Sequence, residues 1–202
     1  MENISNLLFW VSNSLLIPDI ILLLLLFVRS ILLIGGFYNQ YLVKLRTDKW
    51  LKNCMQLESL DIEGLKSYST QIGRSLFNSY LQLVLKVGTD DKKADFLISN
   101  FEIEAEKDLS ISRLLLKLGP ILGLIGTLVA MSPALVGLSQ GDVTGMAYNM
   151  QIVFATTVVG LLVSGIGLFT LQVKQRWYAY DLNNLDYISR TIIDQEDAKE
   201  KK

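Results

Sequence analysis

Three long apolar segments are the feature of this sequence that most constrains its fold. Residues 150–173 contain no charged side chain, residues 114–138 contain only Lys117, and residues 20–38 contain only Arg29. A helix of about 20 apolar residues is long enough to cross the hydrocarbon core of a bilayer. Because lipid offers no hydrogen-bond partner to the backbone, each such segment must satisfy its own N–H and C=O groups as a helix. The sequence therefore predicts an all-α membrane protein with three transmembrane helices.

Basic residues are distributed unevenly around the three predicted spans. None lies in residues 1–19 or 139–149, whereas several follow the first and third spans: Lys44, Arg46, Lys49, Lys52, Lys174 and Arg176. Short loops rich in Lys and Arg stay on the cytoplasmic side of a membrane. We therefore expect residues 1–19 and the turn at 139–149 to lie outside the cytoplasm, and residues 39–113 and 174–202 to lie inside it.

The segments outside the three spans are also predicted to be helical. Residues 1–19 place apolar residues at helical spacing ahead of Pro18, which predicts a short interfacial helix. Within residues 39–113, an amphipathic helix is expected to end at Gly88, and a new helix to start at Asp90 or Asp91 and continue into the second span. Residues 174–202 are expected to extend the third span as a cytoplasmic helix and tail.

The residues that carry most enzyme chemistry are missing or isolated. The chain has no histidine, and Cys54 is its only cysteine, which excludes an internal disulfide and most cysteine-based metal sites. Glu102, Glu104 and Glu106 alternate along a predicted helix and do not converge on one point. The net charge of −1 gives no general attraction to nucleic acid. We therefore expect no enzyme activity, no metal site, no cofactor and no nucleic-acid partner.

Small residues form one stripe on each of the last two predicted spans, because they recur at the helical period of about 100° per residue. The second-span stripe contains Gly119, Gly123, Thr127, Ala130 and Ala134, with Pro120 and Gly126 in the same stretch, and the third-span stripe contains Thr157, Gly160, Ser164 and Gly167, with Thr156 at its edge. Two interpretations are open. The stripes let helix backbones approach closely in lipid, or the hydroxyls of Thr127, Thr156, Thr157 and Ser164 line a path for water or an ion.

A path for protons would lack a titrating group within these two spans. A hydroxyl does not titrate at physiological pH, and proton routes through membranes normally use Asp, Glu or His. The second and third spans contain none of these residues. If the protein moves protons, we therefore expect the titrating carboxylate to come from another chain.

Two motifs resemble those of the MotA/TolQ/ExbB proton-channel family. The sequence GLIGT at residues 123–127, after Pro120, looks like the family's G-L-x-G-T signature. The sequence ATTVVGL at residues 155–161 resembles the A-T-x-x-x-G-L stretch of the family's last span. The order of the segments is similar to that of the ExbB/TolQ branch. The close resemblance covers residues 114–180, and elsewhere only the order of the segments agrees.

The resemblance implies a ring-forming motor subunit in the inner membrane. Members of the family form a ring, usually a pentamer, around the paired single spans of a partner such as ExbD, TolR or MotB, whose membrane aspartate carries the proton. Thr127 and Thr157 match the family's pore-facing threonines. The resemblance thus implies a homopentamer, surrounded by membrane lipid, that conducts protons with a partner dimer and converts the flow into mechanical work.

The sequence departs from the family at two positions and leaves two alternatives open. Ala130 stands where the family often has glycine, and Ile152 stands where ExbB-like proteins often carry glutamate, so that position supplies no ring-borne carboxylate. The resemblance assigns no role to Arg29. Threonines tolerate sodium as well as protons, so a sodium-driven motor is one alternative. The small-residue stripes alone would also suit a non-conducting structural scaffold in the membrane.

Overall fold

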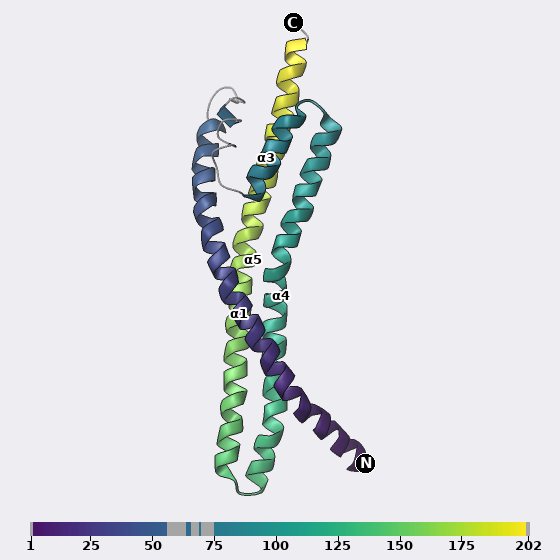
Figure 1. Cartoon of the computed structure of the whole chain (residues 1–202), viewed down its shortest axis with the longest axis vertical. Coiled ribbons are helices and arrows are strands. Elements are labelled where there is room, and N and C mark those ends of the chain that lie inside the picture. The colour runs from purple at the N-terminus through teal and green to yellow at the C-terminus, as the bar shows by residue number, and fades with distance from the viewer. Residues whose placement is uncertain (1, 56–63, 66–68, 70–74, 201–202) are drawn as a thin grey trace. The chain divides into compact units, whose positions relative to one another are not determined.

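The described part of the chain is all-helical apart from its turns, as the sequence predicts. The structure, a computed structural model, describes residues 2–55, 64, 65, 69 and 75–200. This part of the chain contains four helices: α1 (Glu2–Met55), α3 (Leu76–Val87), α4 (Asp91–Ser139) and α5 (Val143–Glu200) (Figure 1).

The helices contribute to two compact units. The first unit consists of Met1–Ile34 and Ile111–Leu171, and the second consists of Gly35–Ser110 and Gln172–Lys202. Helices α1, α4 and α5 each contribute to both units, whereas α3 belongs to the second unit alone. The first unit therefore contains the predicted second span and most of the other two.

In the first unit, α4 and α5 form an antiparallel hairpin (Figure 1). Gly141 in the connecting turn has φ 75°, a left-handed conformation that glycine adopts without steric cost. Asp142 caps α5, because its Oδ1 accepts a hydrogen bond from the N–H of Gly145 at 2.9 Å. This tight reversal brings α4 and α5 side by side.

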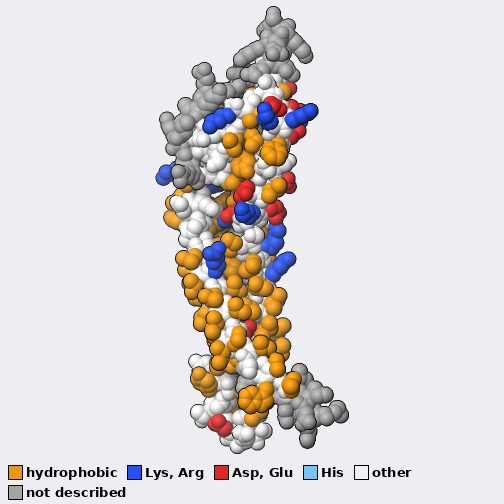
Figure 2. All heavy atoms as spheres, turned by 45° about the vertical axis from the view of Figure 1, so that its right-hand side comes forward, with side chains coloured by type: hydrophobic (Ala, Val, Ile, Leu, Met, Phe, Trp, Pro, Cys, Tyr) orange, Lys and Arg blue, Asp and Glu red, His pale blue; other side chains and the backbone are white. Residues whose placement is uncertain are grey.

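Three of the helices contain stretches that are long and apolar enough to cross a membrane, within Ser14–Lys49, Asp91–Ser139 and Val143–Gln195. Many of their large apolar side chains point outward, including Leu25, Leu128 and Phe154. On the face shown in Figure 2, hydrophobic side chains form a broad band that few charged side chains interrupt. An apolar surface of this extent is stable only when lipid or protein covers it. The chain is therefore a multi-pass membrane protein, and its orientation in the membrane stays a prediction.

Helix α1 continues through Pro18 without a break. The N-terminal helix expected in residues 1–19 is thus not a separate element, although its position at the membrane interface stays a prediction. The apolar stretch of α1 starts at Ser14, ahead of the proline. Proline is tolerated in membrane helices because neighbouring groups satisfy the carbonyl that it frees. As a result, Asp19 lies on the same continuous helix as the apolar run that follows it.

In the second unit, α3 packs into a hydrophobic core, and both of its ends are well defined. The Ser75 hydroxyl accepts a hydrogen bond from the N–H of Asn78 at 3.1 Å, and Gly88 follows the helix with φ 64°. Asp90 Oδ1 then accepts a hydrogen bond from the N–H of Lys93 at 3.2 Å in the first turn of α4. The predicted helix stop and restart is confirmed. The buried core consists of Leu51, Leu65, Phe77, Leu81, Val84, Leu85, Phe101, Leu185, Ile188 and Ile192.

Both helix continuations expected from the sequence are confirmed. Helix α4 runs without a break from Asp91 through the second predicted span, and α5 continues from the third predicted span to Glu200. The side chain of Cys54 and residues 201–202 lie outside the described residues.

Candidate functional site

Glycines let the backbones of α4 and α5 touch in the first unit. A Cβ atom built on Gly119 would lie 2.5 Å from the carbonyl oxygen of Gly160, and one built on Gly160 would lie 2.5 Å from the carbonyl oxygen of Gly119. No side chain fits at such distances, so the two helices approach as closely as glycine permits. We call this contact the α4–α5 seam, and it consists of Gly119, Gly123, Gly126, Thr156, Gly160, Ser164 and Gly167.

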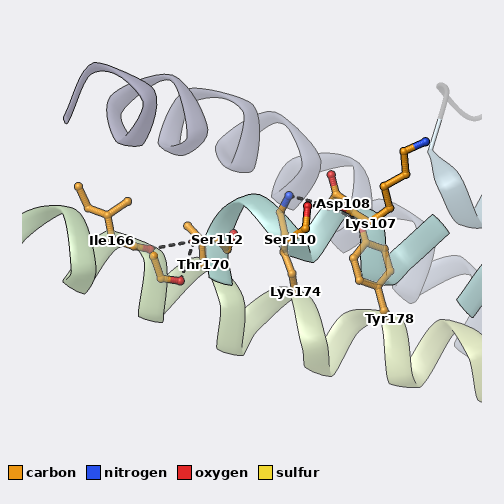
Figure 3. Close-up of polar contacts among 9 residues, drawn as sticks. Lys107, Asp108, Ser110, Ser112, Ile166, Thr170, Lys174 and Tyr178 are labelled. Carbon is orange, nitrogen blue, oxygen red and sulfur yellow. Dashed lines mark hydrogen bonds and ion pairs between the residues drawn. The ribbon is translucent and has the colours of Figure 1, made fainter. Parts of the chain in front are cut away.

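Hydrogen bonds between the two helices stabilise the seam. The Ser164 hydroxyl donates to the carbonyl oxygen of Leu116 at 3.1 Å. Near the end of the unit, the Thr170 hydroxyl oxygen of α5 lies 3.1 Å from that of Ser112 on α4, as Figure 3 shows, and both side chains are buried. Close packing and hydrogen bonds are the main forces that associate helices in lipid. The packing interpretation therefore accounts for Ser164 and for the glycines of the seam.

The predicted stripe residues differ in burial. Gly119, Gly123, Gly126, Ala130, Ala134, Thr156, Gly160 and Gly167 are buried, Thr127, Thr157 and Ser164 are half-buried, and Pro120 is exposed. Thr156, which the helical period places at the edge of its stripe, lies inside the seam instead. Of the predicted ion-path threonines, only Thr127 and Thr157 keep a partly free surface in the single chain.

All three threonines give their hydroxyl proton to their own helix. Each donates to a carbonyl three or four residues earlier, at 2.7 Å for Thr127 and at 3.0 Å for Thr156 and Thr157. A hydroxyl has one proton and two lone pairs, so the lone pairs stay available as acceptors. The arrangement can therefore accept hydrogen bonds from water, from a protonated acid or from a bound cation's hydration shell.

Helix α1 places a carboxylate on the seam. Asp19 is 4% exposed. A Cβ atom built on Gly126 would lie 2.9 Å from Oδ2 of Asp19 and 2.9 Å from Oγ1 of Thr156, so both oxygens lie beside the same glycine of α4. Within the described part of the chain, neither carboxylate oxygen of Asp19 has a hydrogen-bond partner. The seam is therefore a contact of three helices, one of which contributes a titratable group.

Reasoning from the sequence missed Asp19, because it placed this residue outside the first span and searched only the last two spans for an acid. The chain itself thus places a carboxylate beside the seam, whereas the expectation that the titrating carboxylate comes from another chain stays a prediction. One signal could have found it: Asp19, Leu23 and Ser30 recur at helical spacing along α1, and the structure buries all three.

In the second unit, buried charged groups of different helices are paired. The Lys174 ammonium of α5 lies 2.8 Å from Oδ2 of Asp108 on α4, and the Tyr178 hydroxyl donates to the same oxygen at 2.6 Å (Figure 3). Lys44 of α1 forms an ion pair with the buried Asp181 of α5. Because each of these charges has a partner, the pairs join helices and are not sites that await a ligand.

Comparison with known proteins identifies a family for the part of the chain that contains the seam. The sequence model of the MotA/TolQ/ExbB proton channel family matches residues 69–184, more than half of the chain. The match includes α3 and the whole α4–α5 seam, but not α1 and Asp19. No curated protein matches the chain in sequence. The match confirms the resemblance seen in the two motifs and does not distinguish among the branches. The chain therefore belongs to the MotA/TolQ/ExbB proton channel family, a family of membrane channels and motor subunits and not of enzymes.

Proposed function

We propose that this chain is the ring-forming subunit of a motor driven by the proton-motive force, which conducts protons together with a single-span partner of the ExbD, TolR or MotB type. Membership of the family supports a proton-channel motor subunit in general. The observation that carries the finer proposal is the pair Thr127 and Thr157. Both hydroxyls lie in the matched segment, are half-buried, and donate to their own helices, so that their lone pairs remain available.

The two threonines suit a partner carboxylate that alternates between two protonation states. An ionised aspartate at mid-membrane is costly. A water molecule that donates one O–H to the carboxylate and the other to Thr127 or Thr157 lowers this cost. When the partner's aspartate is protonated, its own O–H donates to the threonine directly. Proton binding therefore changes the contact between ring and partner, and such changes at successive subunits drive rotation.

The assembly that this function requires is a homopentamer around a partner dimer, in the cytoplasmic membrane, with the N-terminus outside and the C-terminus inside. The half-buried state of Thr127 and Thr157 in the single chain supports it, because these side chains have surface left for a further helix. A membrane potential of 100 mV supplies about 2.3 kcal/mol for each proton, which is enough to bias single steps.

The substitution Thr157→Val tests the threonine path. Valine has nearly the shape of threonine but offers no lone pair, so we expect at least a tenfold fall in proton flux with the ring still assembled. The flux is measured with a pH-sensitive dye in liposomes that contain the ring and its copurified partner. Thr191→Val is the matched control, because Thr191 also donates to a carbonyl of its own helix, at 2.8 Å, but lies in the second unit. An unchanged flux in T157V would contradict the threonine path.

The same liposomes distinguish the alternatives. Flux that follows a sodium gradient and not a proton gradient would identify a sodium-driven motor. A ring that retains no single-span partner and passes neither ion would identify a structural scaffold, for which the close glycine packing of the seam is the supporting observation.

A further inference from the structure

Asp19 is a buried carboxylate that the proposed motor does not use. It is 4% exposed, and among the described residues neither of its carboxylate oxygens has a hydrogen-bond partner. The buried Lys174 and Asp181 differ from it, because each has an ion-pair partner. A buried carboxylate that is ionised and unpaired is costly. Asp19 therefore requires a donor or a cation that the described chain does not supply.

The side-chain oxygen that lies beside Asp19 at Gly126 is an acceptor. Thr156 Oγ1 gives its proton to the backbone of α5 and faces Gly126 with its lone pairs. Between Lys117 and Asp142, α4 carries no charged residue, and the part of α5 at residues 143–173 carries none either; its one titratable side chain there, Tyr148, is exposed. No charged group of α4 or α5 thus lies near Asp19 along either helix.

The carboxylate lies far from the turn that joins α4 and α5. Gly126 is 13 residues from Ser139, where α4 ends, and Thr156 is 13 residues from Val143, where α5 begins. At 1.5 Å per residue, both positions are about 20 Å along their helices from the turn. The hydrocarbon core of a bilayer is about 30 Å thick. Asp19 therefore lies beside the middle of the second predicted span and, in the third, beside a residue six positions from its start.

We propose that Asp19 and Thr156 form a proton-binding site within this chain, additional to the carboxylate of the partner. A protonated Asp19 supplies the missing donor, because its O–H can reach a lone pair of Thr156 through one water molecule. Oδ2 of Asp19 and Oγ1 of Thr156 both lie 2.9 Å from the same point beside Gly126, so the two oxygens are at most about 5.8 Å apart. On release, the proton passes from the carboxyl oxygen to water, which leaves a carboxylate and a hydronium ion.

Gly126 makes this site possible. A Cβ atom at this position would lie 2.8 Å from Cβ of Thr156 and 2.9 Å from Oδ2 of Asp19, so a larger residue would separate the two groups. The second glycine of the GLIGT motif therefore leaves room for a carboxylate from α1. The role of the bound proton in transport rests on the proposed function. Proton binding at Asp19 does not rest on it and is tested separately.

Infrared difference spectroscopy of the ring with its copurified partner, in lipid, tests the binding. We expect a carboxylic-acid C=O band that titrates with pH, is lost in Asp19→Asn and is kept in Asp142→Asn, which changes an exposed carboxylate of the turn. Thr156→Val should shift the frequency of this band, whereas Thr156→Ser, which keeps the hydroxyl, should leave the frequency unchanged. Comparison of these two variants assigns the band to the site without any change at Asp19. A wild-type spectrum without an Asp19 acid band at any pH overturns the proposal. Loss of the band on addition of sodium chloride, at constant pH, overturns it in favour of a sodium site.

Proton flux in liposomes tests the role of the site in transport. We expect the flux of Asp19→Asn to fall at least tenfold and that of Asp142→Asn to equal the wild type. An unchanged flux in D19N overturns the role of Asp19 in transport. If the wild type carries no flux but shows the Asp19 band, the proposed function fails while the proton-binding site stands, so the two failures are distinguishable.

Discussion

Gly160 and Gly165 are five residues apart on α5 and have opposite surroundings. A Cβ atom built on Gly160 would lie 2.5 Å from the carbonyl oxygen of Gly119 and 3.0 Å from Cα of Gly123, whereas one built on Gly165 meets nothing within 4 Å. The obstacles at Gly160 are backbone atoms, which cannot rotate away as a flexible side chain can. Glycine is therefore required at position 160 and not at position 165.

The substitution Gly160→Ala should destabilise the protein, because α4 and α5 must separate to admit the methyl group. Overpacking of this kind costs about 1–3 kcal/mol. Gly165→Ala should leave the free energy of unfolding unchanged or raise it by up to about 1 kcal/mol, since alanine favours the helix. Chemical unfolding in mixed micelles, followed by circular dichroism, measures both. Equal losses of stability in the two variants would contradict the close contact at the seam.

At the scale of elements, α4 and α5 are held together by different interactions in the two units. In the first unit the contact is close glycine packing, which suits a lipid environment without a hydrophobic drive between helices. In the second unit, Lys174 of α5 is paired with Asp108 of α4, and Tyr178 donates to the same carboxylate. The Lys174 side chain is 6% exposed, so removal of its partner leaves a buried charge.

The substitution Asp108→Asn should lower the free energy of unfolding by about 2 kcal/mol. The loss of a fully buried partner costs about 3–5 kcal/mol, and the value is smaller here because the Asp108 side chain is 35% exposed. The matched control is Asp186→Asn, which breaks the exposed pair of Asp186 with Arg190 at 3.0 Å and should cost about 0.5 kcal/mol or less. Thermal unfolding compares the two variants, and an equal shift would show that the Lys174 pair contributes no more than a surface pair.

At the scale of the whole molecule, the apolar surface implies a membrane, and the charges indicate an orientation. Many large aliphatic and aromatic side chains of the three apolar helices are exposed. Basic residues are missing before the first predicted span and between the second and third. The positive-inside rule therefore predicts that the turn between α4 and α5 lies outside and that the end of α5 lies in the cytoplasm.

Cysteine labelling in cells tests this orientation. The background is Cys54→Ser, which removes the one native thiol. Gln140→Cys, at an exposed position of the turn, should react with a membrane-impermeant maleimide in intact cells. Arg190→Cys, at an exposed position near the end of α5, should react only after the membrane is opened. The reverse pattern would invert the predicted topology.

The sequence by itself determined the features that depend on local composition and period. Apolar length predicted three membrane helices, Gly88 predicted the break between α3 and α4, and two short motifs indicated the family, because each of these signals lies within a few turns of one helix. The helical period also predicted which glycines of α4 and α5 share a face.

Only the tertiary structure decided what covers that face. The helical period predicted that Thr156 lies at the edge of its stripe, and the first predicted span begins after Asp19. The structure nevertheless buries both residues beside Gly126. Asp19 and Gly126 are more than a hundred residues apart in the chain, so no local pattern reports their contact. Helix α1 continues through Pro18 and packs on the seam, and this packing of a third helix is a property of the folded chain alone.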